Sequence, residues 1–178
     1  MDSDSKKQLR KSLKEVVIPD REAKEARIFE TAAVLIAPFT NIYIFNSIGN
    51  EPNTKPIIDH CFANDKRVFL PVVKGKEMFF VEVNSKTEYL KGAFGIQEPR
   101  YVVETRKSEN EIPSPDIVFV PLCAYTKTFE RLGKGGGFYD RFLPTVTCSK
   151  IGLSFAEFEV PSVYAEPHDV KLDGVLKQ

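Results

Sequence analysis

Four of the ten glycines in this chain lie within one short segment, Arg131-Leu132-Gly133-Lys134-Gly135-Gly136-Gly137-Phe138-Tyr139-Asp140. Glycine has no Cβ, so such a segment can approach a ligand closely and can turn successive backbone N–H groups toward one point. The apolar side chains from Phe138 to Leu143 are spaced as on one face of a helix. A glycine-rich loop that leads into a helix, with Lys134 inside it and Arg131 before it, is suited to binding phosphate. A flexible surface turn is the alternative that composition allows.

The spacing of this segment distinguishes it from two common phosphate-binding loops. A Walker A loop ends in Gly-Lys-Ser or Gly-Lys-Thr, and the sequence has neither ending. The dinucleotide fingerprint G-x-G-x-x-G fails at Phe138, which stands where its third glycine belongs. The segment from Arg131 to Leu143 instead resembles the signature of the 5-formyltetrahydrofolate cyclo-ligase family (5,10-methenyltetrahydrofolate synthetases).

The resemblance implies that the glycine-rich loop binds the phosphates of ATP, the co-substrate of this family. Arg131 and Lys134 would neutralise the phosphates as catalytic residues, and Tyr139, the third predicted catalytic residue, would contact the substrate or the nucleotide. Asp140 would face a Mg²⁺ ion that bridges the phosphates, although acidic residues are common in the first turn of any helix. Some relatives carry lysine at the position of Gly136. The predicted nucleotide-binding residues of the loop are Arg131, Leu132, Gly133, Lys134, Gly135, Gly136, Gly137, Phe138 and Tyr139.

Positive charges near the N-terminus are a second candidate for phosphate binding. A helix is expected over residues 6–17, with Lys6 and Arg10 four residues apart and Lys7 and Lys11 at the same spacing. Like charges at this spacing repel each other on a helix, and a bound anion would offset that repulsion. A solvated basic face is the alternative. The resemblance implies a Lys-x-x-x-Arg pair that reaches the nucleotide, and Lys6 with Arg10 fits it best.

A glutamate that follows the first predicted strand is the candidate for binding the folate. Glu51 lies in the loop 46–53 after the apolar run 42–45, and open α/β sheets bind ligands beyond the carboxyl ends of their strands. Spacing alone favours a solvated loop carboxylate. The resemblance implies instead that Glu51 accepts hydrogen bonds from the amino-pyrimidine edge of the pterin, because a carboxylate can accept two parallel N–H bonds.

The remaining substrate-binding predictions also come from the resemblance. Met78 of a predicted hairpin and Phe94 of the Phe-Gly-Ile-Gln-Glu-Pro segment would line the folate pocket together with Tyr139; as an alternative, Met78 belongs to the core. The tail, residues 166–175, resembles the closing motif of the family. His168 and Asp169 within it are expected to fix the tail by hydrogen bonds rather than to act as an acid–base pair. The sequence departs from the family pattern at Leu122 and Thr126, to which no role is transferred.

Helical and apolar patterns alternate along the chain and predict one α/β domain over residues 1–178. The expected architecture is a mostly parallel, Rossmann-like open sheet flanked by helices on both faces, with an antiparallel hairpin addition. Helices are expected at 6–17, 20–37, 54–63 and 138–143, and strands at 42–45, 68–72, 78–83, 116–122 and 151–155.

Composition excludes several other classes of protein. Basic and acidic residues balance at 25 each, which argues against a nucleic-acid or anionic-membrane partner. The sequence has no apolar run near the roughly 20 residues of a membrane span and no apolar signal region at its N-terminus. Three cysteines without a C-x-x-C pair argue against a disulfide framework and a structural zinc site. We therefore expect a cytoplasmic protein. A monomer is expected as well, although composition does not indicate the oligomeric state.

The family reaction closes 5-formyltetrahydrofolate, with or without a polyglutamate tail, into 5,10-methenyltetrahydrofolate and releases ADP and phosphate. The resemblance implies that ATP phosphorylates the formyl oxygen, because phosphate leaves far more easily than an amide oxygen. Two alternatives remain at this point. Sugar-phosphate isomerases and acyl-CoA transferases have related sheets and glycine-rich loops, and a non-catalytic protein could bind nucleotide or store folate.

Overall fold

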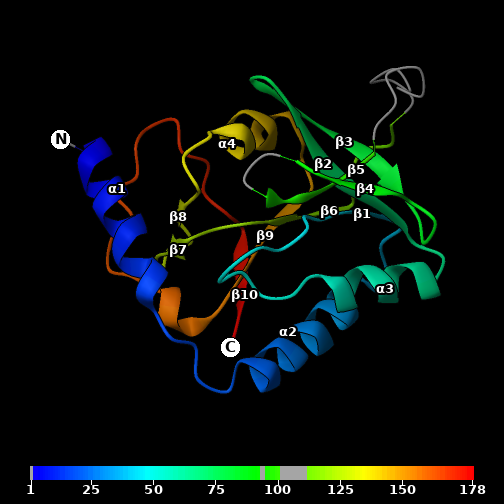
Figure 1. The fold of residues 1–178 in the computed structure, drawn as a ribbon, viewed down its shortest axis with the longest axis horizontal. Helices are drawn as coiled ribbons and strands as arrows, with labels where there is room; N and C mark the ends of the chain where they lie inside the picture. Colours follow the sequence, from blue (N-terminus) through cyan, green and yellow to red (C-terminus); the bar gives the residue numbers. More distant parts are fainter. Residues whose placement is uncertain (1, 93–94, 101–111) are drawn as a thin grey trace.

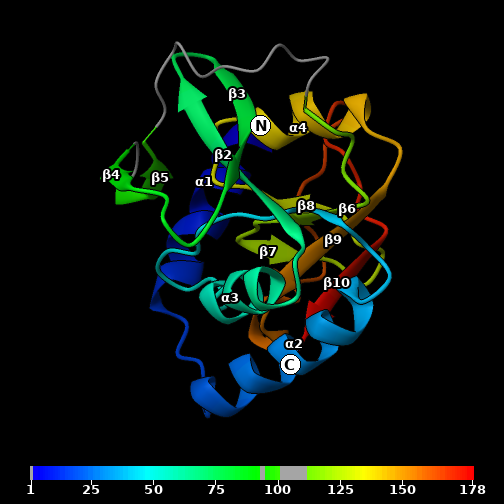
Figure 2. The same ribbon diagram turned by 90° about the vertical axis from the view of Figure 1, so that its right-hand side faces the viewer.

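The computed structural model describes residues 2–92, 95–100 and 112–178, and within these ranges six strands form one mixed sheet (Figures 1 and 2). The strand order is β10-β9-β6-β1-β2-β3. Neighbouring strands are parallel from β10 to β2, whereas β3 is antiparallel to β2. The predicted class, a mostly parallel open sheet with an antiparallel addition, is confirmed. The six strands are β1 (Asn41–Tyr43), β2 (Arg67–Lys74), β3 (Glu77–Val83), β6 (Ile117–Val120), β9 (Ser149–Ser154) and β10 (Gly174–Lys177).

The centre of the sheet is apolar on both faces. All four residues of β6 are fully buried, and β1 beside it contributes Ile42 and Tyr43 to the core. Side chains of a strand alternate between the two faces of a sheet, so a strand buried throughout must be covered on both. This is why the continuous apolar runs in the sequence became the inner parallel strands.

Helices cover the two faces unequally. The views in Figures 1 and 2 agree that α2 (Arg21–Ile36) and α3 (Lys55–Ala63) lie on one side of the sheet and that α4 (Phe138–Phe142) lies on the other. The buried residues of α2 recur every four positions, which turns one apolar stripe of that helix toward the sheet. They are Ile28, Ala32 and Ile36.

An aromatic cluster attaches α4 to the sheet. The ring of Tyr43 lies 4.8 Å from that of Phe69 and 4.6 Å from that of Phe80, measured between ring centroids. The ring of Phe142, at the end of α4, lies 4.7 Å from that of Phe80. These rings join β1, β2 and β3 to the helix that follows the glycine-rich loop, and they therefore fix the C-terminal side of that loop.

The ends of the predicted elements were less accurate than the elements themselves. The first helix, α1, spans Asp2–Ser12 and a short 3-10 helix follows it, so the prediction of 6–17 was wrong at both ends. Sequence analysis also missed the edge strand β10 and two small ribbons. These ribbons pair β4 (Tyr89–Lys91) with β5 (Gln97–Pro99), and β7 (Ala124–Tyr125) with β8 (Arg131–Leu132).

Phe94 and the polar segment around residues 107–110 lie outside the described residues. In the described part of the chain, no helix combines the length and the apolar character that a membrane span requires.

Candidate active site

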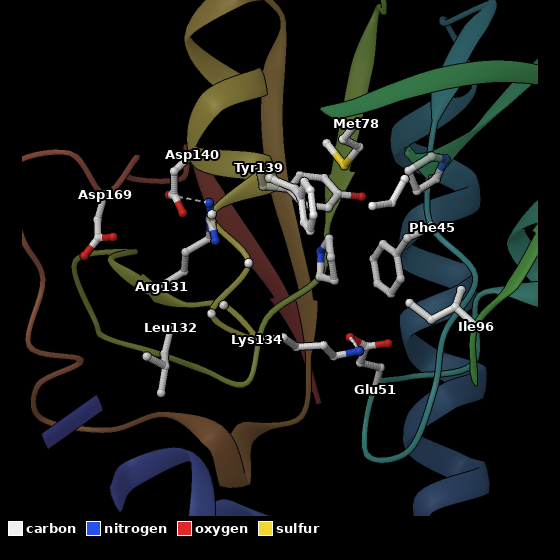
Figure 3. Close-up of a pocket in the computed structure, with 18 of the residues that line it drawn as sticks. Phe45, Glu51, Met78, Ile96, Arg131, Leu132, Lys134, Tyr139, Asp140 and Asp169 are labelled. Atoms are coloured by element: carbon white, nitrogen blue, oxygen red, sulfur yellow. Dashed lines mark hydrogen bonds and ion pairs between the residues drawn. The ribbon is translucent and has the colours of Figure 1, made fainter. Parts of the chain in front are cut away.

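A cavity of about 320 Å³ opens at the carboxyl ends of β1, β2 and β6 (Figure 3). The glycine-rich loop, residues 133–137, forms one of its walls. The opposite wall comes from the end of β1, with Phe45, from Glu51 in the loop beyond it, and from the β2–β3 hairpin, with Met78. The cavity therefore lies where open parallel sheets place their ligands.

The β7–β8 ribbon carries the chain into the glycine-rich loop. The backbone N–H of Cys123 donates to the carbonyl of Leu132 over 2.6 Å, which fixes the start of the loop. Gly135 has φ of +100°, and Gly137, immediately before α4, has φ of +63°. Because side chains with a Cβ rarely adopt these angles, glycine is required at both positions to turn the backbone into the helix.

Arg131 and Asp140 form an ion pair beneath this loop. The Arg131 Nη2 atom lies 2.6 Å from Asp140 Oδ1, and the arginine side chain is only 3% exposed. The same Asp140 oxygen accepts the backbone N–H of Val170 over 3.2 Å. Burial lowers the pKa of the Arg131 guanidinium, an effect that the neighbouring carboxylate opposes. Asp140 thus connects α4, the glycine-rich loop and the C-terminal tail.

The N-terminal helix reaches the cavity through Lys6 and Arg10. The Lys6 ammonium lies 2.6 Å from a carboxylate oxygen of Glu166 and 2.6 Å from one of Asp169. Burial lowers the pKa of Lys6, but the two carboxylates outweigh this and the pKa is raised. The Nε of Arg10 donates to the carbonyl of Gly133 over 2.7 Å.

The alternative basic pair on α1 lies elsewhere. Lys7 and Lys11 are exposed and do not line the cavity, whereas Lys6 and Arg10 do. Of the two pairs with the same spacing, the structure therefore brings only the predicted one to the glycine-rich loop. His168 and Asp169 of the tail line the same cavity, and Asp169 also accepts the backbone N–H of Glu166.

Glu51 is a buried carboxylate, not a solvated one. Its side chain is 4% exposed, and its Oε1 lies 2.6 Å from the Lys134 ammonium. Its Oε2 accepts the backbone N–H of Ile48 over 2.8 Å. Burial raises the pKa of the Glu51 carboxyl, while Lys134 acts in the opposite direction. A guanidinium nitrogen of Arg21 donates to the backbone carbonyl of Glu51 over 2.8 Å and fixes this part of the loop.

Apolar side chains and one tyrosine complete the cavity. Figure 3 shows Met78 beside Tyr139, with Phe45 and Ile96 near the Glu51 side. The Tyr139 hydroxyl is buried and has no hydrogen-bond partner among the described residues. Burial raises the pKa of this phenol, so it stays protonated at any physiological pH. A buried hydroxyl without a partner calls for an explanation, and a ligand that accepts its hydrogen bond would provide one.

Most predicted site residues come together in this cavity. Lys6, Arg10, Glu51, Met78 and every residue from Arg131 to Asp140 line it. Leu132 belongs to the hydrophobic core, so its side chain has a structural role. Sequence analysis missed Phe45, although its place at the carboxyl end of a predicted strand could have indicated it.

Fold and site together define an open α/β protein whose cavity lies between a glycine-rich loop on one side and a buried carboxylate and an apolar wall on the other. The family model for the 5-formyltetrahydrofolate cyclo-ligase family matches residues 2–178. The chain belongs to this family.

Individual relatives agree with this assignment. The 5-formyltetrahydrofolate cyclo-ligase of Haemophilus influenzae is 34% identical over 142 residues, which cover 76% of this chain and 74% of that protein. The enzyme of that name from Mus musculus is 30% identical over 146 residues, 76% of this chain and 71% of the relative.

Two solved structures share the fold. The 5,10-methenyltetrahydrofolate synthetase of Aquifex aeolicus has a TM-score of 0.74 at 25% identity and covers 97% of this chain and 89% of its own. That of Mycoplasma pneumoniae has a TM-score of 0.71 at 22% identity, over 99% of this chain and 98% of its own.

Proposed function

We propose that this chain catalyses the ATP-dependent cyclisation of 5-formyltetrahydrofolate to 5,10-methenyltetrahydrofolate, with release of ADP and phosphate. Membership of the family indicates cyclo-ligase activity. One structural observation supports the two-substrate reaction most strongly: the glycine-rich loop and the buried carboxylate of Glu51 line the same cavity. A nucleotide on the loop and a pterin on Glu51 would meet inside it.

The nucleotide would bind along the glycine-rich loop. Backbone N–H groups of residues 133–137 would contact the phosphates, with Lys134 and Arg131 neutralising their charge. Arg10 supports this placement, because its guanidinium lies against Gly135 and its Nε is bonded to the loop backbone. Lys6 would act from farther back, since two carboxylates already hold its ammonium.

The folate would occupy the apolar side of the cavity. Glu51 would accept N–H bonds from the amino-pyrimidine edge of the pterin, and Met78 would pack against its ring. The Tyr139 hydroxyl supports a ligand here, because a buried donor without a partner destabilises the fold by about 1–3 kcal/mol. Phe94 remains a prediction for this pocket.

Asp140 fits the requirements of a magnesium ligand. Mg²⁺ prefers oxygen ligands, and Asp140 lines the cavity beside the phosphate loop. Asp140 Oδ1 accepts hydrogen bonds from Arg131 and Val170, and we infer that Oδ2 would face the cation. A bound Mg²⁺ would supply charge neutralisation between the phosphates and this carboxylate.

In the proposed chemistry, the formyl oxygen attacks the γ-phosphorus of ATP, and the bond to ADP breaks as the new P–O bond forms. The neighbouring folate nitrogen then attacks the formyl carbon and loses its proton. Phosphate departs with the C–O electron pair, which leaves the methenyl bridge. The contribution of the chain is to position both substrates and to stabilise the shifting negative charge through Lys134 and Arg131.

A spectrophotometric assay with ATP, Mg²⁺ and 5-formyltetrahydrofolate tests this proposal. We expect the ultraviolet absorbance of methenyltetrahydrofolate to rise only when all three are present. A sugar-phosphate isomerase or an acyl-CoA transferase would release no ADP in this mixture, and a storage protein would bind both ligands without the absorbance change. Either of those results would contradict the proposal. A cytoplasmic location, a monomeric state and the use of polyglutamylated substrate remain predictions.

A further inference from the structure

The Lys134–Glu51 ion pair spans the cavity. Lys134 belongs to the glycine-rich loop and Glu51 to the loop after β1, and their charged atoms lie 2.6 Å apart (Figure 3). Exposure is unequal within the pair: the Glu51 side chain is 4% exposed, whereas that of Lys134 is 36% exposed. A partly exposed cation therefore contacts a buried anion.

This contact occupies groups that the proposed function assigns to two different ligands. Glu51 Oε1 faces the Lys134 ammonium and Oε2 accepts the N–H of Ile48, so each carboxylate oxygen already has a polar neighbour. A pterin that needs both oxygens must displace at least the ammonium. A nucleotide phosphate that uses Lys134 must likewise remove it from Glu51.

The structure indicates which partner moves. Arg21 donates to the backbone carbonyl of Glu51, and the backbone N–H of Ile48 donates to its carboxylate, so the residue is fixed at its main chain and at its side chain. Lys134 stands between Gly133 and Gly135 on a flexible four-carbon stem, and within the described residues its ammonium pairs with Glu51. The lysine can therefore turn to a phosphate while the glutamate keeps its place.

We propose that Lys134 exchanges Glu51 for a nucleotide phosphate, and that this exchange makes ATP and 5-formyltetrahydrofolate bind synergistically. This inference rests on the proposed function. Once ATP takes the lysine, the buried carboxylate lacks a cation and favours the N–H donors of the pterin. Once folate takes the carboxylate, the released lysine favours the phosphates. Linkage requires both effects to have the same size.

The sharpest test is nucleotide binding without folate. A non-hydrolysable ATP analogue with Mg²⁺ is titrated calorimetrically into the wild-type chain and into Glu51→Gln. We expect the variant to bind the analogue about two- to fivefold more tightly, the range for a partly exposed ion pair that no longer has to be broken. Asp59→Asn, which removes the carboxylate of the exposed Lys55–Asp59 pair, is the matched control and should leave this affinity unchanged.

A purely structural ion pair gives a different result. If the pair only supports the fold, Glu51→Gln lowers stability and leaves analogue affinity equal or weaker, and that result overturns the inference. The same titration of the wild-type chain with saturating 5-formyltetrahydrofolate should show tighter analogue binding than without it. Equal affinities would also overturn the inference, and cyclisation in the absorbance assay would then show that the proposed function stands without it.

Discussion

Replacement of Asp140 by alanine should destabilise the fold as well as impair catalysis. If Asp140 served only as a magnesium ligand, it would be dispensable for folding. It also pairs with Arg131, whose side chain is 3% exposed. Removing one partner of a buried ion pair costs about 3–5 kcal/mol because the other charge is left without compensation. Since the Asp140 side chain is 19% exposed, we expect the lower end of that range.

A loss of about 3 kcal/mol would lower the Tm of a domain of this size by roughly 6–12 °C. Urea unfolding gives the free energy, and the double variant Arg131→Met/Asp140→Ala isolates the ion pair. It should be less destabilised than the sum of the two single variants, by at least about 1 kcal/mol. If Asp140→Ala unfolds within about 0.5 kcal/mol of the wild-type chain, the ion pair is not a stabilising contact and the reasoning from its burial fails.

Three further predictions concern the ligands and the N-terminal helix. Glu51→Gln should raise the KM for 5-formyltetrahydrofolate at least about tenfold more than the KM for ATP. The affinity for ATP should itself improve in this variant. Equal changes in the two KM values would show that Glu51 does not bind the pterin. Lys134→Ala should weaken ATP-analogue binding by about tenfold or more, and unchanged calorimetric affinity would refute its role in the loop. Burial raises the pKa of the Asp169 carboxyl, but hydrogen bonding to the Lys6 ammonium outweighs this and the pKa is lowered. The Lys6–Asp169 ion pair therefore stabilises the fold at neutral pH, and this stabilisation is lost as the pH falls through the lowered pKa of Asp169. Below about pH 4, the free energy of unfolding measured by circular dichroism should therefore fall less in Lys6→Met than in the wild-type chain. An equal fall in both proteins would contradict the contribution of Lys6.

The inner part of the fold was predictable because its signals are local. β6 is a continuous apolar run, and α2 has a regular buried stripe, so each reveals its own environment. The ribbons β7–β8 and β4–β5 gave no such signal, because two or three residues show no period. They exist through pairing with a partner strand, which single-sequence patterns do not show.

The candidate site, too, was predictable only in part. The glycine-rich loop was recognisable from its residues alone. The place of Glu51 in the site was expected only from the family resemblance, because spacing alone favoured a solvated loop carboxylate. The ion pairs were not predictable. Lys6 contacts acids 160 and 163 residues away, so the fold must bring them together before the pairing exists. Neither did any sequence pattern indicate that Lys134 would contact Glu51 across the cavity.

The most direct test of the account is a crystal structure with Mg²⁺, a non-hydrolysable ATP analogue and 5-formyltetrahydrofolate. We expect the terminal phosphates to lie on the backbone N–H groups of residues 133–137, the pterin edge to contact Glu51, and the formyl oxygen to face the γ-phosphate. A triphosphate bound elsewhere on the chain, with side chains of the protein filling this loop, would contradict it.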